Sequence, residues 1–335
     1  MQIKYYPYQP HCFAFGGFDL QMLNALKAVD KLGVDVTKFD LWGLDKDFDI
    51  IHLWGVSPHN YHIIDWSKKS NKKIVATLLL PYFDTFRLKL SFYKNFLSYG
   101  QREYRKYLNL IDRIVVVNEL QLIILNKYFK VPINKIAIIP NIIEEFYFEI
   151  PDFDFSSKYN INNYILCTGN ISSRKNQLNL AKACIELKLN LVLIGKVLDG
   201  ELLYANELEY LVNNNSNIKW IRGLSNASNE LVSAYYQCEI FALPSTDETQ
   251  PISALEASAM GKPLLMLDRM YAHQKYYKNV TFCRTKEVSD IVLALQECRL
   301  NSDKVIHNFE SANCKEENVG ILYKSIYEDL LSKSN

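Results

Sequence analysis

The sequence has almost no net charge, because 38 Lys and Arg residues are balanced by 37 Asp and Glu residues. A near-neutral chain has no overall electrostatic field that would draw it onto nucleic acid. We therefore expect no nucleic-acid partner.

Long apolar runs are missing as well. The first residues, MQIKYYPYQPH, contain no apolar core of the kind that signal peptides carry. No later stretch reaches the roughly 18 uncharged apolar residues that a membrane-spanning helix needs. We expect a soluble or peripheral protein in the cytoplasm, with the inner face of the cytoplasmic membrane as the second option.

Disulfide and metal-binding patterns are also absent. The seven cysteines are odd in number and never stand at a Cys-x-x-Cys spacing, which argues against a disulfide framework and a zinc site. They are Cys12, Cys167, Cys184, Cys238, Cys283, Cys298 and Cys314. We expect them to be reduced core residues. Since the histidines have no acidic partners at ligand spacing, we expect no metal and no cofactor.

The apolar content, in contrast, is ample. With 49% hydrophobic and 22% charged residues, the composition is that of a globular protein rather than a disordered or fibrous one. The 335 residues exceed the usual size of a single hydrophobic core. Two domains of roughly 150 residues each are therefore expected.

Short apolar runs alternate with amphipathic stretches, which is typical of strand-helix-strand units and parallel sheets. In the first half, the expected strands cover residues 3–8, 34–40, 49–55, 72–80, 112–118 and 135–141, with a helix over 18–33. In the second half, strands over 163–170, 190–196, 218–223, 239–245 and 262–267 alternate with helices over 176–188, 205–213, 229–237 and 251–260. The pattern predicts an α/β protein with two doubly wound domains.

The boundary between these domains is expected near residue 150. The polar segment 149–163 contains Pro151 and shows no helical period, so we interpret it as a linker. This places the domains at 1–150 and 151–314. Residues 315–335 follow with an amphipathic helix, which must bury its apolar face against an existing domain.

The segment FALPSTDETQPISALEASAMGKPLL (241–265) places two glutamates, Glu248 and Glu256, eight positions apart at a strand-to-helix transition. A helix that begins at Gln250 or Pro251 would direct its first amides and its positive end at an anion. The segment thus predicts a phosphate site with two nearby carboxylates. The alternative is a helix-start acid and a solvated helical residue.

Two further loops follow expected strands and precede helices. In GNISSRKNQ (169–177), Arg174 and Lys175 could neutralise a diphosphate, although a solvated basic pair is the plain alternative. In AFGGFD (14–19), Gly16 and Gly17 would let a ligand approach the backbone, or would simply form a tight turn. Neither loop is a G-x-G-x-x-G or Gly-Lys-Ser/Thr motif, which disfavours dehydrogenases and P-loop NTPases.

Taken together, these segments resemble glycosyltransferase family 4 enzymes of the GT-B fold over nearly the whole chain. The resemblance is most specific in residues 244–263, which carry the Glu-x7-Glu spacing and a Leu-Glu-Ala-x-Ala-x-Gly-x-Pro pattern. It implies two Rossmann-like domains that face a central cleft. The N-terminal domain would bind the acceptor, the C-terminal domain would bind the donor, and the last helix would cross back onto the N-terminal domain.

The resemblance also implies roles for individual residues. Glu256 would bind the ribose hydroxyls of a nucleotide-sugar, Glu248 would contact the sugar near its anomeric carbon, and Arg174 with Lys175 would hold the diphosphate. The other residues expected on the donor side are Gly16, Gly17, Asn170, Lys196, Arg222, Gly223, Thr249, Gln250, Pro251 and Ile252. The chain departs from the family pattern where Asn170 replaces a common arginine and where Thr249-Gln250-Pro251 replaces Gly-Phe-Gly. A histidine common in the stretch that matches 76–81 is also missing.

The acceptor side carries weaker signals. His52 and His59 lie near the end of the third expected strand and are candidates for acceptor contact, with structural hydrogen bonding as the alternative. The segment 86–107 contains six basic residues interleaved with seven aromatics. It could lie on an anionic membrane surface, or form an ordinary helix with a solvated cationic face.

The function that the resemblance implies is a retaining transfer of a hexose-type sugar from a nucleotide-diphosphate sugar, a UDP-sugar before a GDP-sugar. The acceptor would be a hydroxyl of a glycan or a polyprenyl-diphosphate-linked glycan, in bacterial surface polysaccharide synthesis. Catalysis would rest on positioning and electrostatics without a metal. Two alternatives stay open, which are a nucleotide-sugar epimerase of similar architecture and a catalytically degenerate nucleotide-sugar-binding subunit.

Overall fold

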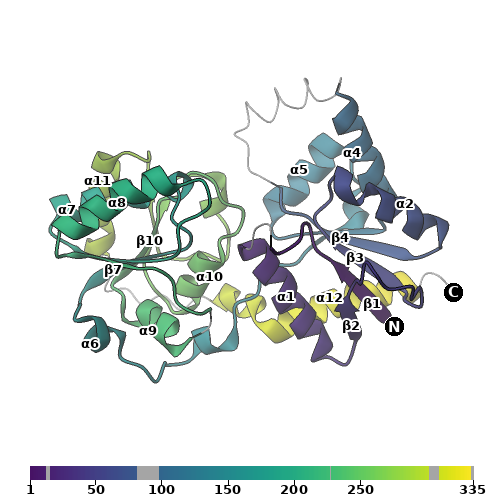
Figure 1. The fold of residues 1–335 in the computed structure, drawn as a ribbon, viewed down its shortest axis with the longest axis horizontal. Coiled ribbons are helices and arrows are strands. Elements are labelled where there is room, and N and C mark those ends of the chain that lie inside the picture. Colours follow the sequence, from purple (N-terminus) through teal and green to yellow (C-terminus); the bar gives the residue numbers. More distant parts are fainter. Residues whose placement is uncertain (13–15, 81–97, 227, 302–308, 333–335) are drawn as a thin grey trace. The chain divides into compact units, whose positions relative to one another are not determined.

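The computed structural model describes residues 1–12, 16–80, 98–226, 228–301 and 309–332. The chain divides into two compact units. Unit 1 comprises Met1–Ile142 and Asn313–Asn335, and unit 2 comprises Ile143–Ala312 (Figure 1).

Unit 1 is built on a six-stranded parallel sheet with the order β2-β1-β3-β4-β5-β6. The strands are β1 (Gln2–Tyr6), β2 (Asp35–Lys38), β3 (Ile50–Trp54), β4 (Lys73–Thr77), β5 (Arg113–Val116) and β6 (Ile136–Ile138). Five of them lie within runs that the sequence predicts as strands, and β1 begins one residue before its predicted run. The central strands are almost wholly apolar because both faces of the sheet are covered by helices.

One face of this sheet packs against α1 and α12, and the other against α2, α4 and α5 (Figure 1). The helices are α1 (Gly17–Asp30), α2 (Tyr61–Lys69), α4 (Tyr99–Leu110), α5 (Glu119–Phe129) and α12 (Glu316–Ser332), with short 3-10 helices η1 (Pro58–Asn60) and η2 (Ile133–Lys135). The 3-10 helix η6 (Phe309–Cys314) spans the division between the two units. A Cβ on Gly320 would lie 2.9 Å from the Ala28 carbonyl oxygen, so α12 approaches α1 closely there. This confirms that the last helix returns to the N-terminal domain.

Unit 2 contains a second six-stranded parallel sheet, with the order β12-β11-β10-β7-β8-β9. Its strands are β7 (Tyr164–Thr168), β8 (Asn190–Ile194), β9 (Ile218–Ile221), β10 (Ile240–Leu243), β11 (Leu264–Leu267) and β12 (Val280–Cys283). Counted from β7, this is the strand order of dinucleotide-binding folds. The expectation of two doubly wound parallel domains is thus confirmed.

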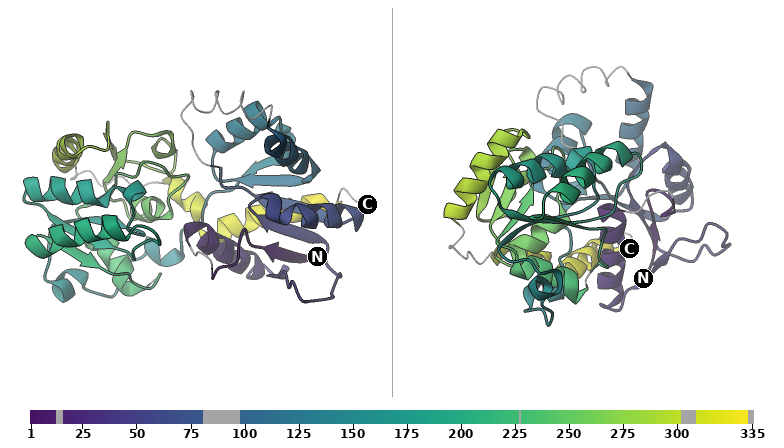
Figure 2. Two further views of the ribbon diagram at one scale, coloured as in Figure 1. Left: turned by 45° about the horizontal axis from the view of Figure 1, so that its top comes forward. Right: turned by 60° about the vertical axis from the view of Figure 1, so that its left-hand side comes forward.

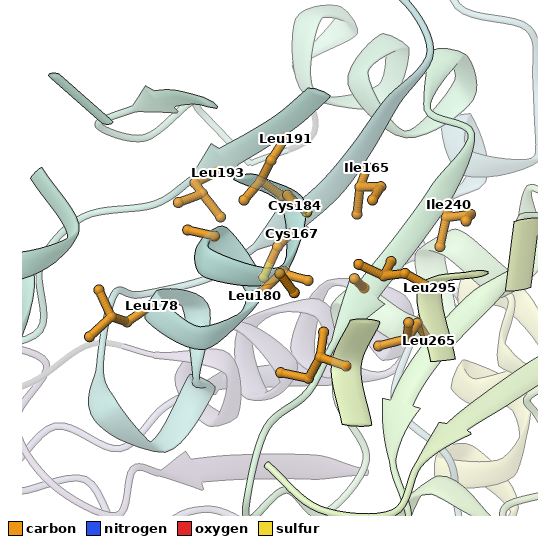
Figure 3. Close-up of a cluster of buried hydrophobic side chains, with 14 of the residues drawn as sticks. Ile165, Cys167, Leu178, Leu180, Cys184, Leu191, Leu193, Ile240, Leu265 and Leu295 are labelled. Carbon is orange, nitrogen blue, oxygen red and sulfur yellow. The ribbon is translucent and has the colours of Figure 1, made fainter. Parts of the chain in front are cut away.

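The helices of unit 2 cover both faces of its sheet (Figure 2). They are α6 (Phe155–Tyr159), α7 (Gln177–Glu186), α8 (Leu202–Asn214), α9 (Asn229–Gln237), α10 (Ile252–Ala259) and α11 (Val288–Leu300), with 3-10 helices η3 (Glu145–Phe148), η4 (Ser173–Lys175) and η5 (Met270–Ala272). One core cluster lies between the sheet and α7, α8 and α11. Leu180 and Cys184 of α7 meet Leu191 of β8 and Leu295 of α11 there (Figure 3).

Two details of the domain linker differ from the expectation. Residues 149–163 were expected to lack a helix, but they contain α6, which begins where the Asp154 carboxylate accepts a hydrogen bond from the Ser157 amide at 3.0 Å. Phe155 anchors this helix because its side chain is fully buried. The division between the units falls after Ile142 rather than near residue 150, because η3 buries Tyr147 in unit 2.

The structure also contains β12 and α11, which the sequence analysis did not identify. All seven cysteines carry free thiols, and six of them are buried as expected. Cys12 is exposed, so the expectation of a core position was wrong for this residue.

In the described part of the chain, no helix has both the length and the apolar character needed to cross a membrane. Residues 86–97 of the basic aromatic segment lie outside the described residues, and the remainder forms part of α4. There, Tyr107 donates a hydrogen bond to Asp65 at 2.8 Å, and Arg105 donates one to the Tyr128 carbonyl at 3.1 Å. Arg102 and Lys106 are exposed.

Candidate active site

The candidate site of unit 2 lies where the order of its strands reverses. Strands β7 and β10 are neighbours in the sheet, and the helices that follow them, α7 and α10, lie on opposite faces (Figure 1). Open α/β sheets bind their ligands at the carboxyl ends of the strands at such a switch point. The loops 169–176 and 244–251, which carry most of the predicted residues, both begin there.

The two loops are tied to each other through Arg174. Its carbonyl oxygen accepts hydrogen bonds from the Thr246 amide at 2.8 Å and from the Ser245 hydroxyl at 3.2 Å. Its guanidinium donates to the Asp247 carbonyl. The loop after β7 therefore holds the loop after β10 in a defined position.

Glu248 lies at the centre of a compact charge cluster formed by these loops. Its Oε1 atom is 2.6 Å from Lys175 Nζ and 2.8 Å from Arg174 Nη1, and it accepts a hydrogen bond from Ser245 at 3.0 Å. The Glu248 and Lys175 side chains are only 12% and 11% exposed. Burial alone would raise the pKa of Glu248, but Lys175, Arg174 and the hydroxyl outweigh it and hold the pKa below its usual value.

The Lys175 side chain runs close to the backbone at the end of β7. A Cβ on Gly169, which has a φ of +123°, would lie 3.4 Å from Lys175 Cε. A Cβ on Gly195 would lie only 2.0 Å from the Gly169 carbonyl oxygen. Glycine is favoured at position 169 by the positive φ and at position 195 by the close approach of the Gly169 carbonyl.

Glu256, the second predicted carboxylate, lies in α10 and is partly buried. Its carboxylate accepts hydrogen bonds from the hydroxyls of Tyr235 and Tyr147. Burial raises the pKa of Glu256 to about 7, with a further contribution from Glu144. Near neutral pH this group is consequently divided between its two protonation states.

The start of α10 differs slightly from the expectation. The helix begins at Ile252 after Pro251, one or two residues later than predicted. The Ala254 amide already donates to the Pro251 carbonyl at 3.1 Å, so at most Ile252 and Ser253 of the first three helical amides remain for an anion. The positive end of the helix still favours a negative ligand there.

The residues just before α10 are partly used by the protein itself. Gln250 is 4% exposed and donates from its side chain to Gln274 Oε1 at 2.9 Å. Gln274 in turn donates to the Thr249 carbonyl at 2.7 Å. These contacts occupy the side-chain amide of Gln250 and the carbonyl of Thr249 within the protein itself.

The residues predicted to flank the base gather at the ends of β8 and β9. A Cβ on Gly223, whose φ is +122°, would lie 3.3 Å from Lys196 Cγ. The Arg222 guanidinium stacks on Trp220 at 3.5 Å from the ring centroid and pairs with Glu209 at 2.5 Å.

Asn170 lies at the start of the loop after β7. Its side chain is exposed, and its carbonyl accepts a hydrogen bond from Gln177 at 3.0 Å. The position is therefore accessible to a ligand, but it carries no charge.

In unit 1, the glycine pair lies at the start of α1. The Gly16 amide donates to Asp19 at 2.9 Å and so caps the helix, and Gly17 is exposed as its first residue. Residues 13–15 of this loop lie outside the described residues. His59 is exposed in η1.

His52 does not fit the expected contact with an acceptor. It is fully buried in β3, with Nδ1 2.7 Å from the Tyr327 hydroxyl and Nε2 2.8 Å from Thr77 Oγ1. Because both ring nitrogens are occupied, neither is available to an acceptor. Burial lowers the pKa of His52 to about 3, so the ring is neutral.

Four residues around the two glutamates were missed by the sequence analysis. Tyr147, Tyr235 and Thr168 surround Glu256 through direct or linked hydrogen bonds, and Ser245 contacts Glu248. Their only sequence signal was a hydroxyl at or next to an apolar segment, which does not reveal spatial neighbours. Among the described residues, no three His, Cys, Asp or Glu side chains come together as metal ligands.

Comparisons with known proteins agree with this architecture. A family model described as "Glycosyl transferases group 1" matches residues 150–305, and one described as "Glycosyltransferase Family 4" matches residues 20–145. No curated sequence matches the chain significantly.

Solved structures similar to this chain include sucrose-phosphate synthase from Thermosynechococcus elongatus, with a TM-score of 0.75, 13% identity, and 99% and 100% of the two chains covered. Anabaena HepE in complex with UDP-glucose has a TM-score of 0.73 at 15% identity, with coverage of 99% and 100%. A glycosyltransferase from Rickettsia africae has a TM-score of 0.72 at 16% identity and covers 98% of each chain. At such identities the likeness shows a common fold.

Proposed function

We propose that this chain, which belongs to glycosyltransferase family 4 and has the GT-B fold, is a retaining enzyme that uses a nucleotide-diphosphate sugar. The observation that carries the proposal is the cluster of Arg174, Lys175 and Glu248 at the switch point of unit 2. It brings two cations, which suit a diphosphate, together with the Glu248 carboxylate, and Asp247 lies beside them in the same loop. We favour a UDP-sugar as donor, because HepE of the same fold was solved with UDP-glucose.

The diphosphate would bind between the cationic pair and the start of α10. Arg174 offers a planar fork of donors, and Lys175 offers a compact charge that burial shields from solvent. As the glycosidic bond breaks, negative charge grows on the leaving phosphate, and groups already in place stabilise it without reorganisation. The pair therefore acts on the transition state more than on the bound donor.

Glu248 would act on the sugar as a carboxylate. Its pKa is lowered by Lys175 and Arg174, so it is ionised at neutral pH and can hold sugar hydroxyls or stabilise an oxocarbenium-like carbon. Its Oε1 atom already contacts two cations, which weakens it as a covalent nucleophile. We therefore favour same-face attack, in which the acceptor oxygen bonds to the anomeric carbon, the bond to phosphate breaks, and the leaving phosphate takes the acceptor proton.

Unit 1 would supply the acceptor side. The proposed acceptor is a hydroxyl of a glycan or of a polyprenyl-diphosphate-linked glycan, in surface polysaccharide synthesis. Peripheral contact of segment 86–107 with an anionic membrane is part of this proposal, supported by the exposed Arg102 and Lys106 on α4. Gly17, at the open start of α1, is the proposed contact of unit 1 with the donor.

A donor and acceptor screen tests the function. The protein is incubated with UDP- and GDP-sugars, with and without lipid-linked acceptors, while nucleotide release is followed. Acceptor-dependent release of nucleotide with retained anomeric configuration in the product is the expected result. An epimerised donor would identify an epimerase instead, and nucleotide binding without turnover would identify a degenerate binding subunit.

A further inference from the structure

Two tyrosines from different elements hold the Glu256 carboxylate. Tyr147 lies on η3 and Tyr235 on α9, and the hydroxyls of both donate to Glu256. Each tyrosine is 1% exposed, and the two rings meet edge to face with centroids 5.5 Å apart. Because both rings are packed in the interior, their hydroxyls have little freedom to move.

The orientation of Tyr235 is set by the sheet. Thr168, at the end of β7, places Oγ1 2.5 Å from the Tyr235 hydroxyl. A tyrosine has one proton to donate, and Tyr235 gives it to Glu256, so it accepts the proton of Thr168. A chain of hydrogen bonds thus runs from the switch-point strand to the carboxylate on α10.

The two tyrosines use only part of the hydrogen-bond acceptor capacity of the Glu256 carboxylate. An ionised carboxylate has about four acceptor positions, of which the two tyrosines use two. The remaining two suit a pair of neighbouring hydroxyls. Burial and the nearby Glu144 favour the protonated form of Glu256, whereas the two tyrosine hydrogen bonds favour the ionised form.

We propose that Tyr147 and Tyr235 are positioning residues that fix the Glu256 carboxylate in one orientation, so that the acceptor positions the tyrosines leave can bind the ribose diol of the nucleotide. The inference rests on the proposed function, because the diol is that of the donor. It adds two residues and a mechanism to the assignment of Glu256 itself.

We call the contact of Tyr147 and Tyr235 with Glu256 the tyrosine clamp. Calorimetric titration of the 335-residue chain tests this clamp. UDP and 2′,3′-dideoxy-UDP are titrated into the wild type, Tyr147→Phe, Tyr235→Phe and the double variant, on both sides of the pH of about 7 at which Glu256 titrates. Tyr236→Phe is the matched control, because Tyr236 neighbours Tyr235 on α9 but is 42% exposed.

The preference of the wild type for UDP over the dideoxy nucleotide is expected to fall roughly tenfold in each single variant, as for the loss of a hydrogen bond to a charged group. The pH below which UDP binding weakens is expected to rise, because each variant removes a contact that favours the ionised form. Tyr236→Phe is expected to change neither quantity. Thr168→Val keeps both tyrosines and should cause a smaller loss of the same preference, which provides a test if a tyrosine variant does not fold.

Other outcomes separate the two proposals. If the wild type binds UDP but does not prefer it over the dideoxy nucleotide, or if the folded variants keep the preference and the pH midpoint, the clamp is wrong and the proposed function stands. If the wild type binds neither UDP nor GDP, the proposed function fails, and the role of the clamp fails with it.

Discussion

In unit 1 the buried polar cluster around His52 is neutral and its ring nitrogens are both hydrogen-bonded, whereas in unit 2 the cluster around Glu248 joins two cations to one carboxylate. His52 lies inside β3, where Tyr327 and Thr77 occupy both ring nitrogens and the ring stays neutral. Glu248 lies beyond the end of β10, where two cations compete for one carboxylate oxygen. His52 thus lies within a strand of the core, whereas Glu248 lies at the carboxyl end of a strand, which is where open α/β sheets commonly bind ligands.

The largest effect is expected from removing the charge of Glu248. Glu248→Gln should lower turnover by about 10²–10³-fold, the range seen when a preorganised electrostatic contact is lost. UDP should bind more tightly at the same time, because the carboxylate no longer competes with the diphosphate for Arg174 and Lys175. Steady-state kinetics and calorimetry measure the two effects.

The control for this variant is Glu239→Gln. Glu239 pairs with Arg299 at 2.9 Å just before β10, at the opposite end of that strand from Glu248. The Glu239→Gln substitution should leave both turnover and UDP affinity at wild-type values. Wild-type turnover in Glu248→Gln would contradict the assignment of the site.

The next largest effect is expected in unit 1. His52→Leu should lower the free energy of unfolding by about 2–4 kcal/mol, because it removes two buried hydrogen bonds, those of the ring with Tyr327 and with Thr77. UDP affinity should not change, because the donor site lies in unit 2. Urea unfolding followed by tryptophan fluorescence is suitable, since Trp42, Trp54 and Trp66 all belong to unit 1.

The comparison variant is His59→Leu, since His59 is exposed. Its effect on stability should stay within about 0.5 kcal/mol, as for most surface substitutions. An equal loss of stability in the two variants would mean that the buried network does not hold unit 1 together.

A smaller effect, on the affinity for UDP, is expected to distinguish Arg174 from Lys175 in unit 2. The Arg174 side chain is 44% exposed, whereas that of Lys175 is 11% exposed, so solvent screens Arg174 more strongly. Arg174→Ala should weaken UDP binding by about tenfold, and Lys175→Ala by more. Calorimetry of both variants shows which of them loses more affinity for UDP. A greater loss in Arg174→Ala than in Lys175→Ala would contradict the prediction.

The smallest effect is expected in the pH dependence of the free energy of unfolding. One titratable group in each unit contributes to it, and the two contributions have opposite signs. Burial lowers the pKa of His52 from 6.5 to about 3, so the unfolded chain binds more protons in that range and stability is lost as the pH falls. Burial raises the pKa of Glu256 from 4.5 to about 7, so the folded chain binds more protons there and stability is lost as the pH rises. The two contributions oppose each other between about 4.5 and 6.5.

Unfolding free energies measured across this range check the signs. Compared with the wild type, His52→Leu should lose less stability as the pH falls. Glu256→Gln should lose less stability than the wild type as the pH rises toward neutral. If the two substitutions shift the slope in the same direction, one of the two assignments is wrong.

Much of the fold was predictable because it depends on local patterns. Apolar runs predicted eleven of the twelve strands in the described residues, and helical spacing predicted α12, whereas its return to unit 1 was implied by the family resemblance. The helix α6 was missed because it is short and is held by one cap and one buried ring, Phe155, rather than by a period. The misplacement of His52 had a similar cause, because nothing local reveals that Tyr327, 275 residues away, bonds to its ring.

By itself, the amino-acid sequence determined the two doubly wound sheets, the loops that carry Glu248, Glu256, Arg174 and Lys175, and the glycosyltransferase family, because periodicity and motif spacing are encoded between near neighbours in the chain. Only the tertiary structure decided which charges meet at Glu248, which tyrosines hold Glu256, and that His52 is closed off from solvent. Those contacts join residues that lie far apart in the sequence, and their protonation states depend on burial, which exists only after the chain has folded.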